Sequence, residues 1–169
     1  MKITTGQAAE IIGVSGATAA KTGRTGLWGP NLGSSARPKW DLETVQAVAE
    51  RPDAPAPPPD ERIVVVTLGA PTQEADGRWI GWNEKWSPDR QRLAAAGAWQ
   101  APRGATAVVA AVAGIVVGVW RTKGPANVDA SGFATYDLAE LEPVDPLREF
   151  TQTRLPIRRG PNRYELRRQ

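Results

Sequence analysis

The stretch "ATAVVAAVAGIVVGVW" at residues 105–120 decides the fold of the C-terminal part of the chain, because it carries no charged side chain. A helix of this length spans about 24 Å, which is short of the roughly 30 Å hydrocarbon core of a bilayer. Six of its residues are valine, and β-branched residues favour strands. Gly114 lies near the middle, and Arg103 and Arg121 bracket the run. We therefore predict two adjacent buried strands, over about 107–113 and 115–122, in preference to a buried helix or a membrane span.

The composition excludes several classes of protein. The chain of 169 residues contains neither cysteine nor histidine, which rules out disulfide scaffolds, thiolate zinc sites and Ser-His-Asp triads. Its carboxylates show no spacing typical of metal ligation or of a paired acid and base. We therefore expect no enzymatic activity and no cofactor. The first residues lack the apolar segment of a signal peptide, so we expect a cytoplasmic protein (in the host cell, if a phage encodes it) with no membrane partner.

Positive charge is concentrated near the ends of the chain. Residues 1–52 carry six Lys or Arg against four Asp or Glu, and residues 148–169 carry seven against two. Basic segments of this kind attract nucleic acid through phosphate contacts and counterion release, although a solubilising tail would show the same excess. We take Arg154, Arg158 and Arg163 as candidate phosphate contacts.

A proline-rich stretch separates two domains. Residues 51–61 read "RPDAPAPPPDE", with five prolines, and proline excludes both a helix interior and a central strand. The stretch predicts an extended spacer. We therefore expect one domain at 1–51, a linker at 52–61 and a second domain at 62–169.

The N-terminal segment predicts a helix-turn-helix. Thr5 can cap a helix that Gly13 ends, and Ser15 can cap a second helix that runs to about Thr22. Asp41 can cap a third helix after a Gly/Ser/Pro-rich segment. Two short helices joined by a tight turn that contains glycine form the helix-turn-helix layout.

These residues resemble a known family. "TTGQAAEIIGVSGAT" and "RPKWDLETVQAVA" resemble the start, and the wing end with its following helix, of the MerR/excisionase class of winged helix-turn-helix domains. The resemblance implies that residues 15–21 face the major groove of double-stranded DNA and that the wing contacts the backbone or minor groove. The candidate DNA-binding residues are Ser15, Thr18, Lys21, Arg24, Arg37, Lys39 and Trp40.

The recognition helix departs from the family pattern. Members of the class often carry arginine beside the Ser and Thr, but here Gly16, Ala17 and Ala19 occupy those positions. Ser and Thr discriminate bases weakly, and no arginine lies within the helix for a bidentate guanine contact. The sequence therefore predicts modest base readout, or readout that a partner supplies.

The second domain reads as mostly strands. "RIVVVTLGAP" at residues 62–71 predicts a buried strand. Further strands are expected at 132–141 and 162–168, and a helix is expected over 87–98. About five strands with one or two helices predict a small mixed β-barrel, so the expected fold class is α+β.

A second resemblance covers residues of this domain. "WQAPRGATAVVAAVAGIVVGVWRT", a later "GF" and a final "RRGPNRYEL" are similar to the PUA-like barrel group that includes EVE and ASCH domains. The resemblance implies a nucleic-acid reader that takes a modified or flipped base into an aromatic pocket. Buried tryptophan more often fills a core. The candidate pocket residues are Trp82, Trp99, Trp120, Arg159, Asn162 and Tyr164.

Three functions remain open at this point. The first is a protein that binds double-stranded DNA, either a transcriptional regulator or a DNA-binding factor of a phage or mobile element. The Ala/Gly/Arg/Pro-rich composition suits a high-GC genome, such as that of an actinobacterium or its phage. The second is a structural or host-interaction protein whose helix-turn-helix binds protein, which Gly16, Ala17 and Ala19 favour. The third is an excisionase-like architectural DNA bender. Either a homodimer or a protein partner is compatible with the sequence.

Overall fold

The computed structural model describes residues 1–69, 72–73, 75, 79–80, 93–94, 105–125, 127–128, 130, 133–135, 137–156 and 163–166. It divides into two compact units. Met1–Pro52 and Gly69–Lys85 form the first, and Asp53–Leu68 and Trp86–Gln169 form the second. Helices and strands occur together, so the mixed α+β class is confirmed.

Three capped helices build the first unit. They are α1 (Thr5–Ile12), α2 (Gly16–Gly23) and α3 (Leu42–Ala49). Thr4, and not Thr5 as predicted, caps α1 in a capping box with Gln7, because the Thr4 side chain accepts from the Gln7 amide. Ser15 and Asp41 cap α2 and α3 as predicted. Gly13 ends α1 in the left-handed conformation, as predicted, and the chain turns tightly there before α2 begins.

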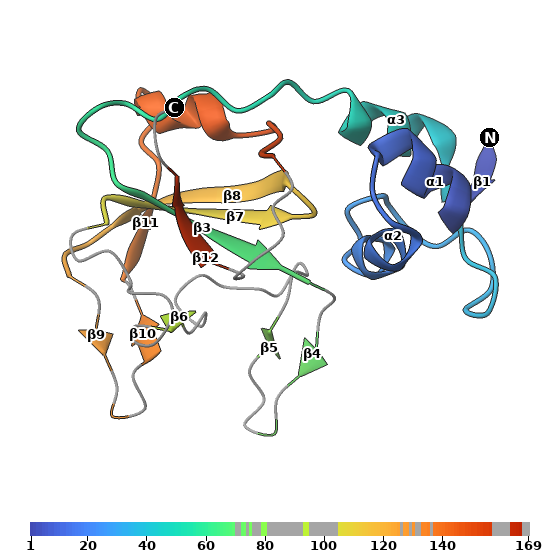
Figure 1. Ribbon diagram of the computed structural model, residues 1–169, viewed down its shortest axis with the longest axis horizontal. Helices are drawn as coiled ribbons and strands as arrows, with labels where there is room; N and C mark the ends of the chain where they lie inside the picture. The colour runs from blue at the N-terminus through green and yellow to red at the C-terminus, as the bar shows by residue number, and fades with distance from the viewer. Residues whose placement is uncertain are drawn as a thin grey trace. The chain divides into compact units, whose positions relative to one another are not determined.

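A two-stranded ribbon lies beside these helices. β1 (Lys2–Thr4) pairs antiparallel with β2 (Lys39–Asp41), with Ile3 opposite Trp40. Figure 1 shows the three helices gathered into one small bundle with β1 beside α1. The centre holds Trp28 and Trp40, which are 0% and 4% exposed and meet edge to face at 5.6 Å between ring centroids. Aromatic pairs in this geometry contribute beyond the area they bury.

A five-stranded mixed sheet organises the second unit. Its strands are β3 (Ile63–Leu68), β7 (Ala107–Val112), β8 (Ile115–Thr122), β11 (Leu138–Glu140) and β12 (Arg163–Leu166). They lie in the order β11-β8-β7-β3-β12, and β3 and β7 run parallel while the other neighbours run antiparallel. All six residues of β7 are buried. A strand buried on both faces loses the polar alternation of an exposed one, which accounts for the unbroken apolar run in the sequence.

The predicted pair of strands in residues 105–120 is confirmed as a hairpin. Val112 pairs with Ile115, which leaves Ala113 and Gly114 as a two-residue turn. Both turn residues have positive φ, 49° and 81°, as the hairpin turns that match strand twist require. The ladder shifts register between Ala110 and Ala111, so the alternation of faces changes once along β8.

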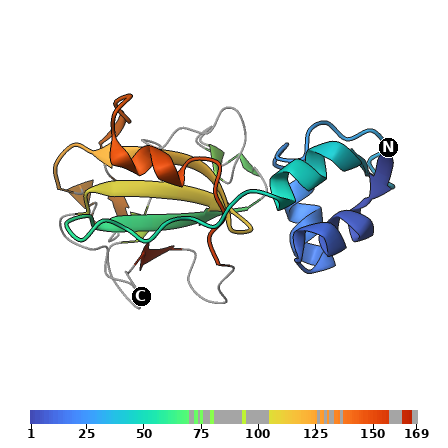
Figure 2. The same ribbon diagram turned by 90° about the horizontal axis from the view of Figure 1, so that it is seen from above.

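One face of the sheet carries the main core. It contains Val65, Val109 and Val119, and the 3₁₀ helix η2 (Pro146–Phe150) adds Leu147 and Phe150. Figure 2 shows η2 lying over the sheet. The opposite face of β3 and β7 is also buried, at residues such as Val64 and Val108.

The proline-rich segment belongs in part to the second unit. The Ala54 amide donates to the Arg154 carbonyl at 2.8 Å, and Asp53 forms a bridge with the same residue. Ala54 packs against the core, and Pro57 is buried. The segment therefore packs on the sheet unit at these residues, whereas the sequence predicted an extended spacer between the two domains.

Short strands make up the other described pieces. β4 (Thr72–Gln73) pairs with β5 (Trp79–Ile80), and β6 (Leu93–Ala94), β10 (Phe133–Thr135) and β9 (Asn127–Val128) form a three-stranded sheet. The helix predicted over 87–98 is wrong at β6, and its other residues lie outside the described part. The strand predicted at 132–141 divides into β10 and β11. Among the described residues, no helix has the length and apolar character needed to cross a bilayer.

Candidate nucleic-acid interface

The second helix presents a surface of small and cationic side chains. Its buried side holds Ala19, Thr22 and Gly23. Gly16 and Ala17 are exposed at its first turn, and Lys21 and Arg24 are exposed at its last. A recognition helix presents the residues of its N-terminal turn to base edges, and exposed cations contact the phosphates. The structure therefore brings two of the predicted cations, Lys21 and Arg24, onto one short helical segment.

Ser15 and Thr18 are engaged in the cap of that helix. The Thr18 amide donates to Ser15 Oγ at 3.2 Å, and Ser15 Oγ donates to Thr18 Oγ1 at 3.0 Å. Ser15 is exposed and Thr18 is half-buried. Both hydroxyls therefore already serve local structure, which reduces what they offer to a base edge.

We expect Ser15→Ala to lower the free energy of unfolding of the first unit by about 1 kcal/mol, because the α2 cap is lost. Urea unfolding followed by helical circular dichroism measures this loss. Ser35→Ala changes another exposed serine of the same unit and should have no measurable effect. Equal effects of the two changes would contradict a capping role.

The predicted wing is a closed loop between α2 and β2, organised by Asn31. Asn31 Oδ1 accepts from the Gly33 amide at 2.9 Å and from the Lys39 amide at 3.1 Å, and its Nδ2 donates to the Ser34 carbonyl. The Leu32 amide also donates to the Lys39 carbonyl. A Cβ on Gly33 would lie 2.3 Å from the Arg37 carbonyl, so only glycine fits. The side-chain bonds of Asn31 close the loop.

The loop exposes Arg37 and Lys39 as predicted, but Trp40 is not at the surface. The Trp40 indole is 4% exposed, and its Nε1 donates to Thr5 Oγ1 at 3.2 Å. Its six-membered ring also lies against Gly23. Alternation along β2 sends Lys39 outward and Trp40 into the core. The proposal of Trp40 as a DNA contact is therefore wrong.

Sequence reasoning missed two residues of this region, Asn31 and Lys2. Asn-x-Gly is a turn signal that identifies the position of Asn31 in hindsight. Lys2 is exposed on β1, and its Nζ lies 3.5 Å from the Leu32 carbonyl oxygen. Strand pairing between residues 2–4 and 39–41 brings Lys2 to the loop, and no local pattern carries that information.

Asp41 lies opposite Lys2 in the β1–β2 register, and both of its carboxylate oxygens are engaged. Oδ2 accepts from the Thr44 amide, and Oδ1 lies 3.5 Å from the N-terminal amine. The hydrogen bond from the Thr44 amide lowers the pKa of Asp41 below its ordinary value, and the amine of Met1 adds to that effect. Asp41 thus stays ionised as a helix cap.

In the second unit, the two described aromatic candidates for a base pocket lie on opposite faces of the sheet. Tyr164 pairs with Val65 and packs against the main core. Trp120 pairs with Val108, and its ring covers Gly118 on the other face. Trp120 and Tyr164 therefore do not line one pocket. The other candidates, Trp82, Trp99, Arg159 and Asn162, lie outside the described residues.

The candidate phosphate contacts in the C-terminal tail are placed in part. Arg154 is half-buried, and its backbone bridges Asp53 and Ile115. Arg163 lies on β12 opposite Val66. Arg158 lies outside the described residues. Arg154 thus holds the proline-rich segment through its backbone, a role that the sequence did not indicate.

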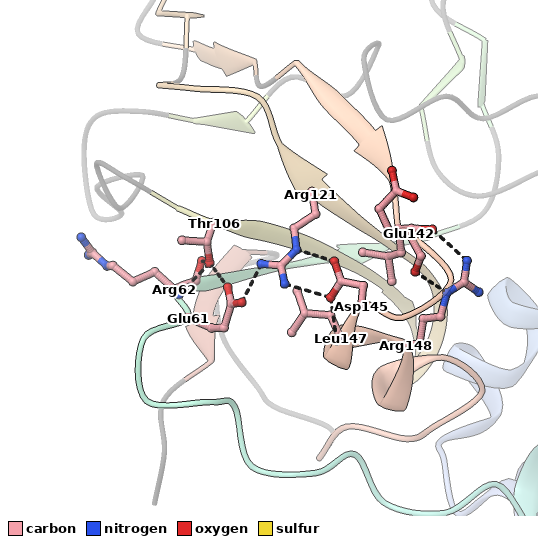
Figure 3. A network of polar contacts seen from close by, with 9 residues as sticks. Glu61, Arg62, Thr106, Arg121, Glu142, Asp145, Leu147 and Arg148 are labelled. Carbon is pink, nitrogen blue, oxygen red and sulfur yellow. Dashed lines mark hydrogen bonds and ion pairs between the residues drawn. The ribbon is translucent and has the colours of Figure 1, made fainter.

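An ion cluster around Arg121 was also missed. The Arg121 guanidinium binds Asp145 through two bonds of 2.7 and 2.8 Å and donates to Glu61 Oε1 at 2.6 Å. Figure 3 shows it between the two acids, with Thr106 on the far side of Glu61. Asp145 also caps η2 by accepting from the Leu147 amide. The cluster therefore ties β8 to the proline-rich segment and to η2.

The ion pair between Arg121 and Asp145 stabilises the charged form of both partners. The hydrogen bonds from Arg121 hold the pKa of Asp145 below its ordinary value, and the bonds to the two acids raise the pKa of Arg121. The side chains of Glu61, Asp145 and Arg121 are 10%, 9% and 28% exposed. We therefore call this cluster a clamp, because its largely buried ion pairs hold β8, the proline-rich segment and η2 together.

No group of His, Cys, Asp and Glu side chains in the described part of the chain could hold a metal ion. A comparison with models of known protein families gave no match, and searches of curated proteins and of solved structures found no protein that matches this chain.

Proposed function

We propose that the first unit binds double-stranded DNA, as part of a transcriptional regulator or a phage or mobile-element DNA-binding factor. The observation that carries the proposal is the arrangement of α2. This helix is capped by Ser15 and follows α1 after a tight turn, with small residues exposed at its first turn and Lys21 and Arg24 exposed at its last. A helix of this kind fits the major groove while its cations reach the flanking phosphates.

Phosphate contacts supply most of the affinity in this proposal. The Ser15 and Thr18 hydroxyls already bond within the helix cap, and no arginine lies inside α2 to read guanine. Exposed Ala17 can contact the methyl group of thymine, which is an apolar base contact. The first unit is therefore expected to discriminate sequences modestly and to depend strongly on salt.

A salt titration tests the proposal. We expect the slope of log K against log[salt] for a duplex to be clearly negative, and Lys21→Ala/Arg24→Ala to reduce its magnitude by about 1.8. Lys123→Ala, an exposed lysine of the second unit, is the control and should leave the slope of the wild type. A wild-type slope near zero would overturn DNA binding by the whole chain.

A selection on random duplex DNA, repeated with modified cytosines, addresses the second unit. We propose that this unit adds a nucleic-acid contact, on the support of the basic residues 148–169. Enrichment that depends on the modification would support a base reader. Identical enrichment with and without the modification would contradict it.

A protein-binding role for α2 is the second candidate, because Gly16 and Ala17 leave an exposed side without strong base readers. A pull-down that finds one protein partner would favour it, provided that Arg37→Ala/Lys39→Ala also leaves DNA retention unchanged. Loss of DNA retention in that variant would exclude it as the main function.

A further inference from the structure

The outer face of the β1–β2 ribbon gathers cations from distant positions in the sequence. Ile3 and Trp40 point into the core, so alternation sends Lys2 and Lys39 to the outer face. Thr4 lies opposite Lys39 and Lys2 opposite Asp41, which makes Lys2 and Lys39 diagonal neighbours about 7–8 Å apart.

The closed loop adds a third cation to this face. The Leu32 carbonyl accepts from Lys2 Nζ, and the Leu32 amide donates to the Lys39 carbonyl. The Arg37 amide donates to Ser34 Oγ, and the Arg37 carbonyl lies close to Gly33. The backbone at residues 37 and 39 is therefore held to residues 32–34, and Leu32 also contacts the ammonium group of Lys2.

The charge of this edge is not neutralised within the described part of the unit. Residues 31–40 contain no acid. Asp41, the nearest acid in register, is bound to the Thr44 amide and the N-terminal amine. No ion pair to Lys2, Arg37 or Lys39 occurs among the residues that the structure describes. Three exposed cations with no acidic partner in the described part of the chain suit contact with a polyanion such as a nucleic acid.

We propose that Lys2, Arg37 and Lys39 form one phosphate-binding edge that contacts the DNA backbone separately from α2. Lys2 itself contacts a phosphate in this proposal. This inference rests on the proposed function of the first unit and deepens it. Lysine binds phosphate as a point charge and arginine binds it through paired hydrogen bonds, so the edge positions the duplex and carries no sequence information.

The test measures salt dependence with the full chain and a fluorescent random-sequence duplex. We expect Lys2→Ala to reduce the magnitude of the slope by about 0.9, which corresponds to an affinity loss of about fivefold near 0.15 M salt. Lys39→Ala, on the other strand, should give the same change. Lys2→Arg should keep the wild-type slope, and Lys123→Ala is the matched lysine control.

The outcomes separate this edge from the proposed function. If the wild type binds with a steep slope but Lys2→Ala and Lys39→Ala match Lys123→Ala, the edge is overturned and the proposed DNA binding by the chain stands. If the wild type shows no salt-dependent binding, the proposed function itself fails. If Lys2→Ala weakens binding to anionic vesicles and not to the duplex, the edge binds lipid headgroups and the inference is wrong.

Discussion

Trp40→Ala should unfold the helical unit of the chain. The indole contacts Trp28, lies against Gly23 of α2 and bonds to Thr5 of α1. Removing a buried tryptophan side chain costs about 3–5 kcal/mol. A unit built mainly from Met1–Pro52 has a total stability of roughly 3–8 kcal/mol, so the loss is comparable with the whole. Urea titration of the full chain, followed by helical circular dichroism, measures it.

A milder substitution and a binding measurement separate the core role from a DNA-contact role. Trp40→Phe keeps an aromatic ring and loses the bond to Thr5, so it should cost less than Trp40→Ala and leave a folded unit. A DNA-contact role would give the opposite pattern. Trp40→Ala would then keep the unfolding free energy of the wild type and lower only the affinity for a duplex.

Arg121→Ala should lower the stability of the sheet unit by about 3 kcal/mol, because it leaves the carboxylates of Glu61 and Asp145 unpaired and largely buried. Arg62→Ala is the matched control. Its pair with Glu165 is at the surface, with Arg62 48% exposed, and such pairs contribute at most about 1 kcal/mol. Urea unfolding at neutral pH compares the two variants. Equal losses would contradict the clamp.

The same variant should change the response to acid. The lowered pKa of Asp145 means that its ion pair stabilises the fold fully above the ordinary carboxyl value of 3.8, and that this contribution is lost as the pH falls through the lower folded value. Without Arg121 the pKa of Asp145 is no longer lowered by that partner. Urea midpoints from neutral pH to about pH 3 should therefore fall less steeply in Arg121→Ala than in the wild type. A parallel fall would show that Arg121 does not hold Asp145 ionised.

The elements that the sequence predicts correctly are those whose formation depends only on residues close together in the chain. The caps at Ser15 and Asp41 and the helix end at Gly13 need only residues within one turn. The hairpin at residues 107–122 follows from valine content and from Gly114, which lies where the chain reverses. The sequence could not decide between Thr4 and Thr5 as the N-cap, because both are threonines that directly precede the same apolar helix face.

The features that the sequence does not predict depend on pairing between distant segments. Trp40 follows two exposed loop cations in the sequence, and only its place opposite Ile3 shows that it is buried. Trp120 and Tyr164 both suit a base pocket by residue type, but the pairing of their strands through β7 and β3 places them on different faces of the sheet. In the sequence, Arg121 only borders an apolar run. Its acidic partners, Glu61 and Asp145, lie 60 and 24 residues away, so no local pattern identifies them.

The Asn31 loop has a thermodynamic consequence for any association through it. Its Gly/Ser-rich sequence would as a free chain lose about 1–2 kcal/mol for each residue that becomes ordered. The bonds from Asn31 to Gly33, Ser34 and Lys39 fix the backbone before any partner arrives. Most of that conformational entropy is thus lost during folding of the unit and not during encounter. One neutral side chain thereby raises the affinity available to its charged neighbours without contacting the partner itself.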